Sequence, residues 1–466
     1  MIPEIAIVGH PNEGKSSVLS TLAEDDSVRI SPYPGETTRC RTFPVIIDHR
    51  EILRFTDTPG FQSPAKLLAK LQTCSGSSAQ RLAELRAFTG SIPELKEDHE
   101  LLEPISRGAG IIYVVDGSRP IRQVDRDEME ILRLIGRPRM AVINAKQDAA
   151  RYLGLWKEEL ARHFNGCRVF NAHRATYAER IALLEALKSV DQDWQAPLAD
   201  AIAAISTDWQ ARARLTAQII SDLLSRSLTL QLSAPLKTGA DEQEIKQGLV
   251  RSYTDSIADL EKAAHAKIRK LFKHNIFNYQ LPPHSILHED LFSERSWKFL
   301  GLSKKQFILL GGIGGGVVGA GVEMAALGHG LGLFTALGAM GGVLGALGSR
   351  QHLDREASLL GIKIGGPQVT IGPAQAISLL FILINRSLLF YQHVINWAHG
   401  RRDYRSAEQE AHTEQHSYTR QWSSLQLKQC HDFFKSAQQP DSEKHQSATA
   451  EIENLLYQAL MQISHS

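Results

Sequence analysis

The residues with the clearest chemistry lie near the start of the sequence, in the segment Gly9–Ser16, which reads GHPNEGKS. It fits the phosphate-loop pattern G-x-x-x-x-G-K-[ST] at every fixed position. Glycines let the backbone curl so that successive N–H groups point at phosphate oxygens, and the Lys15 ammonium would reach the β- and γ-phosphates. The Ser16 hydroxyl would bind Mg²⁺. The segment therefore predicts a site for a nucleoside triphosphate with Mg²⁺.

The elements needed to position this loop lie on either side of it. Ile5–Val8 is a short apolar run typical of a buried strand, and Ser17–Leu22 begins an amphipathic helical pattern. In this order, the N-terminus of the helix directs its partial positive charge at bound phosphate. A glycine-rich turn without a ligand is the alternative, but the lysine and the serine at their fixed positions favour nucleotide binding.

A second motif, Asp57–Gly60, reads DTPG and follows a predicted β-hairpin. The extended runs of that hairpin are Cys40–Ile47 and Glu51–Phe55. In nucleotide hydrolases, a D-x-x-G after a strand provides an Asp that holds Mg²⁺ through water and a Gly whose N–H senses the γ-phosphate. Asp57 and Gly60 are the candidates for these roles.

Together these motifs resemble the Era/TrmE branch of the translation-factor-related GTPases. The loop of that family reads G-x-P-N-x-G-K-S, and its first switch reads [AP]-G-x-T-R, which Pro34–Arg39 matches with one extra residue. The resemblance implies a P-loop GTPase that binds GTP/GDP with Mg²⁺ and hydrolyses GTP. It also implies that a threonine of the first switch closes over Mg²⁺; we assign this role to Thr38, with Thr37 as the fallback.

Two further roles follow from the resemblance. Members that carry the loop asparagine bind K⁺ through it, so Asn12 is a candidate K⁺ ligand. Many GTPases hold a water-positioning glutamine directly after D-x-x-G, where this sequence has Phe61. We therefore expect backbone groups to position the water, with Lys15, Thr38 and Gly60 as the catalytic set. Hydrolysis should be slow unless a partner or homodimerisation assists.

Recognition of the base is expected after two later strands, Met140–Asn144 and Arg168–Phe170. The family motif N-K-x-D, whose Asp binds guanine, is altered here to NAKQD, so that Asn144 matches and Asp148 comes one residue late. Ala172 matches the family motif S-A-K, whose backbone N–H meets the base oxygen. The choice between guanine and adenine stays open. The nucleotide-binding candidates are Gly9, Asn12, Glu13, Gly14, Lys15, Ser16, Ser17, Asp57, Gly60, Asn144, Asp148 and Ala172.

The whole chain, with 466 residues, is long enough for two or three domains. Its formal net charge of +1 gives no global reason to expect nucleic acid. The 4 cysteines form no C-x-x-C pair, which favours reduced thiols over disulfides or a zinc site. No basic-then-apolar leader opens the chain, so we expect its first domain in the cytoplasm.

Residues 1–190 should form an α/β P-loop domain with a mostly parallel sheet and the nucleotide at the carboxyl ends of the strands. Asp191–Pro197 is interpreted as a polar linker, and 198–300 as a mainly α-helical domain. Residues 351–466 predict a helical C-terminal region with a polar tail. In it, Ile377–Tyr391 predicts a buried or interfacial helix, because a charged Arg interrupts the apolar run. One last helix is expected near residues 452–463.

Residues 301–350 are rich in glycine and predict a membrane hairpin. Phe307–Val322 and Gly330–Gly348 carry G-x-x-x-G spacings, which let helices pack closely in lipid, and each leg is near the ~17–25 residues that span a bilayer. Basic residues flank the pair, which favours a return to the cytoplasm. Glu323 and the low hydropathy oppose insertion, so a buried soluble hairpin or a flexible glycine loop are the alternatives.

The order of these segments resembles a family of bacterial GTPases with a C-terminal domain of unknown function. The leading hypothesis is a GTP-hydrolysing switch coupled to a helical C-terminal half that associates with the inner membrane, and so with lipid, through residues 305–350. One alternative is a membrane-anchoring or pore-like protein with a regulatory nucleotide site. Another is a ribosome or RNA assembly GTPase, although the sequence shows no RNA-binding module and predicts no specific nucleic acid partner.

Overall fold

The computed structural model describes residues 2–23, 37–47, 49–144, 150–172, 176–236, 241–272, 287, 358–359, 362–363, 368–374, 377–396 and 417–465. The predicted glycine-rich hairpin at 301–350 and the candidate base-binding residue Asp148 lie outside the described residues. The description therefore concerns the phosphate-binding half of the predicted site and most of the predicted helices.

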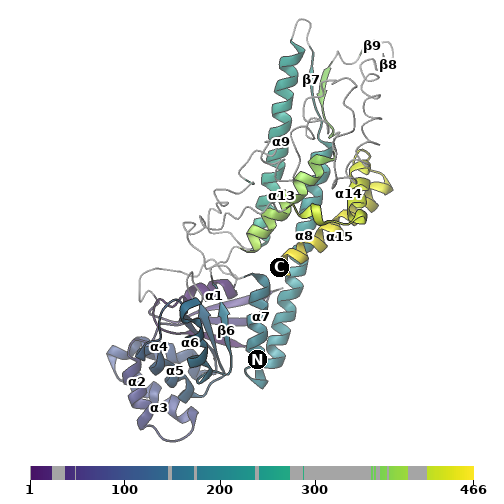
Figure 1. Ribbon diagram of the computed structural model, residues 1–466. Helices are drawn as coiled ribbons and strands as arrows, with labels where there is room; N and C mark the ends of the chain where they lie inside the picture. The colour runs from purple at the N-terminus through teal and green to yellow at the C-terminus, as the bar shows by residue number, and fades with distance from the viewer. Residues whose placement is uncertain are drawn as a thin grey trace.

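A six-stranded sheet forms the centre of the N-terminal domain (Figure 1). Its strands are β1 Glu4–Val8, β2 Arg41–Ile47, β3 Arg50–Asp57, β4 Gly110–Asp116, β5 Arg139–Asn144 and β6 Cys167–Phe170. They lie in the order β2-β3-β1-β4-β5-β6. β2 and β3 form an antiparallel hairpin, and all other neighbouring strands of this sheet are parallel. The predicted mostly parallel sheet is confirmed.

Helices cover both faces of this sheet, which explains why its central strands are continuously apolar. Ala6 and Val8 of β1 point into one core, whereas Ile5 and Ile7 point into the other. The first core is completed by α2 Pro64–Thr73, α3 Ser78–Gly90, α4 Lys96–Ser106, α5 Gln123–Ile135 and α6 Ala150–Ala161. The second is completed by α1 Lys15–Ala23, α7 Tyr177–Lys188 and the start of α8.

Helix α8, Gln195–Thr229, is a single helix of 35 residues that begins within the predicted linker. The interpretation of Asp191–Pro197 as a polar linker is wrong, because a short 3₁₀ turn, Gln192–Trp194, leads directly into α8. Pro197 is tolerated there because the first turn of a helix needs no N–H donors. Gly110 lets the Trp194 indole approach, since a Cβ atom at that glycine would collide with the ring.

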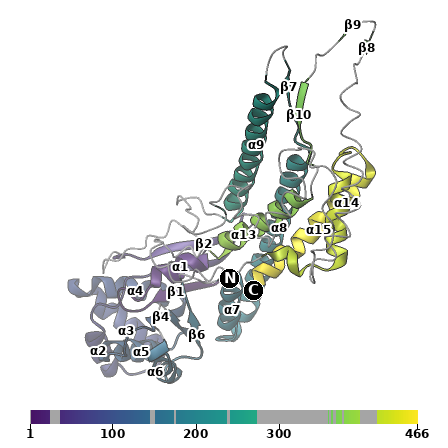
Figure 2. The ribbon, with the colours of Figure 1, turned by 45° about the horizontal axis from the view of Figure 1, so that its top comes forward.

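The C-terminal half is mainly helical, as expected, and its helices share one hydrophobic core with the second half of α8 (Figure 2). They are α9 Glu242–Leu271, α13 Ser378–Ile395, α14 Ser424–Ser436 and α15 Glu443–His465. Within the described part of the chain, α13 alone is long and apolar enough to cross a membrane, but 89% of it is buried inside the protein. It is therefore a core helix, in agreement with the prediction of a buried or interfacial helix.

Two features of this half were not predicted. The polar region after residue 404 was expected to hold one helix near residues 452–463, whereas the structure has both α14 and a longer α15. α14 buries a narrow stripe, Leu427, Cys430 and Phe433, and begins with a capping box between Ser423 and Gln426. In addition, β7 Leu232–Pro235 pairs antiparallel with β10 Gln368–Ile371, and β8 Ser358–Leu359 pairs with β9 Ile362–Lys363.

Candidate nucleotide-binding site

The phosphate loop connects β1 to α1 and depends on the glycines at its two ends. Gly9 and Gly14 have φ angles of +147° and +92°, in the region that favours glycine. A Cβ atom at Gly9 would collide with the carbonyl oxygen of Val114, and one at Gly14 with the side-chain amide of Asn144. The loop can therefore pack against β4 and the end of β5 only with glycine at both positions.

Lys15 opens α1 and is almost fully buried beneath the loop, with 8% of its surface exposed. Its Nζ donates a hydrogen bond to the carbonyl oxygen of His10 at 3.0 Å. Burial lowers the pKa of Lys15, although the carboxylates of Asp57, Glu128 and Glu13 oppose this shift. An ammonium that has lost hydration gains strongly from an anionic ligand, so its position fits phosphate binding.

Asp57, the last residue of β3, lies beside two hydroxyl groups. Ser16 Oγ and Thr37 Oγ1 donate to Asp57 Oδ2 at 3.1 and 3.2 Å. The other oxygen, Oδ1, is buried and has no hydrogen-bond partner in the described part of the chain. Burial raises the pKa of Asp57, although Lys15 and both hydroxyls oppose this shift. Carboxylate and hydroxyl oxygens around an unsatisfied buried atom fit Mg²⁺, which prefers hard oxygen ligands.

The threonine that reaches this cluster is Thr37, not Thr38. Thr38 was predicted to be the switch-one ligand, but its side chain is exposed, whereas Thr37 donates to Asp57. The fallback residue is thus the one that the structure brings into the site.

Gly60 lies against the phosphate loop, where a Cβ atom would collide with Pro11. The motif is held in place because Thr58 Oγ1 donates to the carbonyl oxygen of Ile7 at 2.7 Å. Phe61 is completely buried in the core, so no polar side chain follows Gly60 directly. Gln62 is exposed, and its Nε2 donates back to the Gly60 carbonyl oxygen at 3.2 Å.

Asn144 binds the loop and the neighbouring strand together instead of pointing outward. It is fully buried, its Nδ2 donates to the carbonyl oxygen of Glu13 at 3.2 Å, and its Oδ1 accepts from the N–H of Ala172 at 3.3 Å. The resemblance implied that the Ala172 N–H meets the base oxygen. In the structure this N–H donates to Asn144, so the two residues connect the end of β5 to the residues that follow β6.

The other candidates of the loop take different positions. Asn12 is exposed at the tip with a φ angle of +68°, a conformation that asparagine tolerates better than most residues. Ser17 is buried in the first turn of α1. The Glu13 side chain turns away from the loop and pairs with Arg119, whose Nε lies 2.9 Å from Glu13 Oε1. Glu13 can therefore contact a nucleotide only through its backbone.

The sequence patterns did not predict two networks of hydrogen-bonded polar side chains that lie behind the phosphate loop. Arg119 also donates two hydrogen bonds to Asp125, both at 2.7 Å. Burial raises the pKa of Asp125, but hydrogen bonds from Arg119 and Arg122 outweigh this effect, so the pKa is lowered overall.

In the second network, the buried Glu128 lies 2.8 Å from His10 Nδ1 and accepts a hydrogen bond from the hydroxyl of Tyr113 at 2.9 Å. The residues of these two networks match no sequence motif. The acidic first turn of α5 is the one local pattern that could have indicated them.

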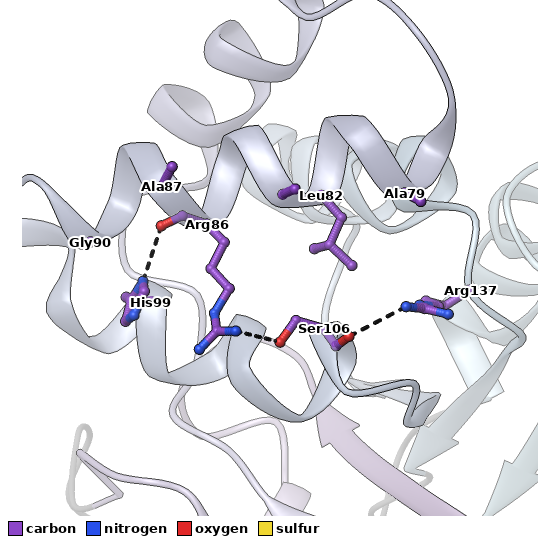
Figure 3. A pocket seen from close by; sticks show the side chains of 9 residues that line it. Ala79, Leu82, Arg86, Ala87, Gly90, His99, Ser106 and Arg137 are labelled. Atoms are coloured by element: carbon purple, nitrogen blue, oxygen red, sulfur yellow. Dashed lines mark hydrogen bonds between the residues drawn. The ribbon is translucent and has the colours of Figure 1, made fainter.

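A hollow of about 590 Å³ lies between α3 and α4, apart from the phosphate loop (Figure 3). Arg86 crosses it to donate to Ser106 Oγ at 2.8 Å, and Arg137 approaches the carbonyl oxygen of Ser106 from the other side. Leu82 points into the space between the two helices. The Arg86 contact holds α4 against α3, and the Arg137 contact joins α4 to the turn between α5 and β5.

Comparison with known families accounts for both halves of the chain. Residues 4–145 match the family described as 50S ribosome-binding GTPase, which corresponds to the P-loop domain. Residues 157–460 match the family described as a domain of unknown function, DUF3482, and this match covers more than half of the chain. The chain belongs to the DUF3482 family. In this DUF3482 protein, the N-terminal domain is a P-loop GTPase domain that binds GTP and hydrolyses it.

Relatives of this DUF3482 protein include GTPases from several bacteria. A probable GTP-binding protein EngB from Anaeromyxobacter sp. (strain K) is 30% identical over 169 residues, which is 34% of this chain and 68% of the relative. GTPase Era from Deinococcus radiodurans is 29% identical over 148 residues, 32% of this chain and 39% of Era. The tRNA modification GTPase MnmE from Geobacillus kaustophilus is 28% identical over 243 residues, 50% of each chain.

Proposed function

We propose that the protein is a GTP-driven switch whose nucleotide state is passed from the GTPase domain to the DUF3482 region through α8. The observation that supports this is the burial of one continuous helix in two cores. Leu198 and Ile202 of α8 pack in the core beneath the sheet, whereas Ile220 and Leu224 pack in the core of the helical half. A small shift of the first part of a rigid helix displaces the second part.

The residues of the site have distinct roles in this proposal. Lys15 and the N–H groups of the loop bind the phosphates, while Ser16, Thr37 and Asp57 hold Mg²⁺. When bound, Mg²⁺ neutralises charge that develops on the transferred phosphoryl group. Thr37 and Gly60 become ordered around the γ-phosphate and are released after hydrolysis. Because Phe61 is buried, we propose that backbone groups position the water, with K⁺ at Asn12 or homodimerisation as accelerating factors.

A chain of contacts links the base end of the site to the helical half. Tyr177, at the start of α7, stacks on Trp209 of α8 with ring centroids 4.1 Å apart. Trp209 Nε1 donates to Ser464 Oγ of α15 at 3.0 Å, and the hydroxyl of Tyr391 in α13 lies 2.7 Å from the same oxygen. α7 follows Ala172 closely in the chain, so a shift of Ala172 on nucleotide binding would be passed through Tyr177 to α8, α13 and α15.

The test of this coupling is hydrogen exchange of the full chain with GDP and with a non-hydrolysable GTP analogue. We expect protection to differ between the two states in the switches, in α8 and in α15. Lys15→Ala, which removes the phosphate contact, should abolish the difference. A nucleotide effect that is confined to the GTPase domain would contradict the coupling.

We further propose that residues 305–350 attach the protein to a membrane, with the inner bacterial membrane as its location. The support is the glycine spacing and the basic flanks of this segment in the sequence. Flotation of the protein with vesicles of anionic lipid is expected, and deletion of residues 305–350 should abolish it without loss of GTP hydrolysis. Vesicle binding that survives the deletion would overturn this part of the proposal.

A second candidate function is ribosome or RNA assembly. The family matched by residues 4–145 is described as ribosome-binding, and one relative is a tRNA modification GTPase. Co-sedimentation of the protein with 50S subunits in the presence of the GTP analogue, but not with GDP, would favour this function over membrane attachment. The switch mechanism of the GTPase domain is the same in both cases.

A further inference from the structure

Asp98 of α4 is a buried carboxylate that the switch mechanism above does not use. Its side chain is completely inaccessible to solvent. Asp98 Oδ1 accepts a hydrogen bond from the backbone N–H of Gln62 at 2.9 Å, and the nearby N–H of Ser63 also favours the charged carboxylate, whereas Oδ2 is buried without a hydrogen-bond partner in the described part of the chain. These two N–H groups come directly after Gly60 and Phe61, so Asp98 contacts the backbone of residues 60–63, which we call the second switch.

The second switch needs this carboxylate for a structural reason. α2 begins at Pro64, and the residue before it, Ser63, makes no side-chain cap. The N–H groups at the start of a helix have no partners within the helix, and a negative charge there also interacts favourably with the helix dipole. Asp98, on a different helix, supplies an acceptor to the N–H of Gln62, two residues before α2 begins, and a negative charge near the start of that helix. It therefore caps the turn between Gly60 and α2 from outside.

α4 is well placed to hold this turn still. His99 Nδ1 lies 3.2 Å from the Arg86 carbonyl oxygen, and Arg86 also binds Ser106, so both ends of α4 are attached to α3 (Figure 3). α4 also contacts the residue that directly follows the first switch, because Cys40 Sγ donates to the carbonyl oxygen of Glu100 at 3.0 Å. α4 thus contacts the chain three residues after Thr37 and two residues after Gly60, the two residues proposed to sense the γ-phosphate.

We propose that Asp98 is the positioning residue of the second switch: it holds the turn after Gly60 so that the Gly60 N–H faces the γ-phosphate, and α4 links this turn to the first switch. The proposal rests on the proposed GTP switch and deepens it. Asp98 touches neither nucleotide nor water in this scheme, and it acts only through the backbone of residues 60–63.

The ionisation of Asp98 provides a second readout. Burial raises the pKa of Asp98 to about 6, and the neighbouring Glu97 adds to this shift, while the N–H groups of Gln62 and Ser63 oppose it. Glu97 is the one charged side chain acting on Asp98 within the described part of the chain. Protonation removes the charge that faces the two N–H groups. The proposal therefore expects a step in the hydrolysis rate near pH 6, with the faster rate at higher pH.

The experiment compares GTP hydrolysis and nucleotide affinity of the full-length protein with those of Asp98→Asn. Asparagine has the same shape but carries no charge and only one acceptor oxygen. We expect kcat to fall about tenfold or more at pH 8, consistent with lost positioning. We also expect weaker binding of a GTP analogue, unchanged binding of GDP and loss of the step near pH 6. Glu94→Gln, an exposed carboxylate just before α4, is the matched control and should match the native protein.

The outcomes separate this inference from the function on which it rests. If the native protein does not hydrolyse GTP, the proposed switch fails. If it does, and Asp98→Asn retains the native kcat, preference for the GTP analogue and pH step, then the positioning role is overturned. Equal loss of GDP and GTP analogue affinity would show general damage to the fold and would also overturn it. Asp98→Glu, which restores the charge, should recover part of the rate and the pH step.

Discussion

At the scale of single residues, the structure distinguishes Thr37 from Thr38 as the threonine that lies in the proposed Mg²⁺ site. Only Thr37 Oγ1 shares Asp57 Oδ2 with Ser16, whereas Thr38 is exposed. We predict that Thr37→Ala slows Mg²⁺-dependent hydrolysis about tenfold or more, equivalent to about 1.4 kcal/mol of transition-state stabilisation. Thr38→Ala should have a small effect. Single-turnover assays across a Mg²⁺ titration test this, and a larger effect of Thr38→Ala would return the role to that residue.

Asn12 offers a second prediction at this scale, because its backbone and its side chain can be separated. Its φ angle of +68° is one that glycine adopts freely, so Asn12→Gly removes the side chain without strain. If the side chain binds K⁺, this variant should lose any stimulation of hydrolysis by K⁺ over Na⁺. The basal rate in Na⁺ should stay close to that of the native protein. Stimulation by K⁺ that persists in the glycine variant would remove Asn12 from the cation site.

At the scale of elements, α13 is kept in the core by an ion pair with α9. Arg386 Nε lies 2.6 Å from Glu261 Oε1, and both side chains are at least nine-tenths buried. We predict that Arg386→Met destabilises the protein by about 3–5 kcal/mol, because it leaves a buried carboxylate uncompensated. Adding Glu261→Leu should recover much of the loss.

Urea denaturation of these variants measures the effect, and an exposed pair provides the control. Arg226 Nη1 lies 3.6 Å from Asp222 Oδ2 on the surface of α8. Arg226→Met should change the free energy of unfolding by less than about 1 kcal/mol. Similar losses for Arg386→Met and Arg226→Met would show that the buried pair contributes no more than a surface pair.

At the scale of the whole molecule, two partly buried histidines predict a loss of stability in acid. Burial lowers the pKa of His265 and of His393 to about 4; Glu261 and Arg386 act on His265 with opposite signs. Because the unfolded chain takes up protons near pH 6.5 and the folded one near pH 4, stability is fully present above pH 6.5 and falls between these values. Over this pH range, each histidine should lower the free energy of unfolding by up to about 3 kcal/mol.

Denaturant midpoints at pH 7 and pH 5 measure this effect. His265 stacks on Phe390 with ring centroids 3.9 Å apart, so His265→Phe keeps an aromatic ring in place while removing the titration. This variant should lose less stability than the native protein when the pH is lowered. An unchanged pH dependence in His265→Phe would mean that other groups titrate over this range.

Short-range patterns were enough to predict the phosphate loop, the D-x-x-G turn and the strands that carry them. These features depend on residues close together in the chain, where glycine conformation, helix N-termini and apolar runs act locally. The sheet with its antiparallel edge hairpin followed from the same patterns. So did the burial of α13, since the charge of Arg386 excludes it from lipid more strongly than its neighbours favour insertion.

What only the tertiary structure decided involves residues far apart in the sequence. Ala172 donates to Asn144, and Arg386 pairs with Glu261, because folding brings distant strands and helices together. α8 begins inside a segment interpreted as a linker, since Trp194 and Leu198 pack against the apolar side chains of the sheet core. The local sequence pattern determined which groups could bind phosphate. Tertiary packing decided how the side chains around them are oriented, because the free energy of burying apolar surface outweighs local conformational preference.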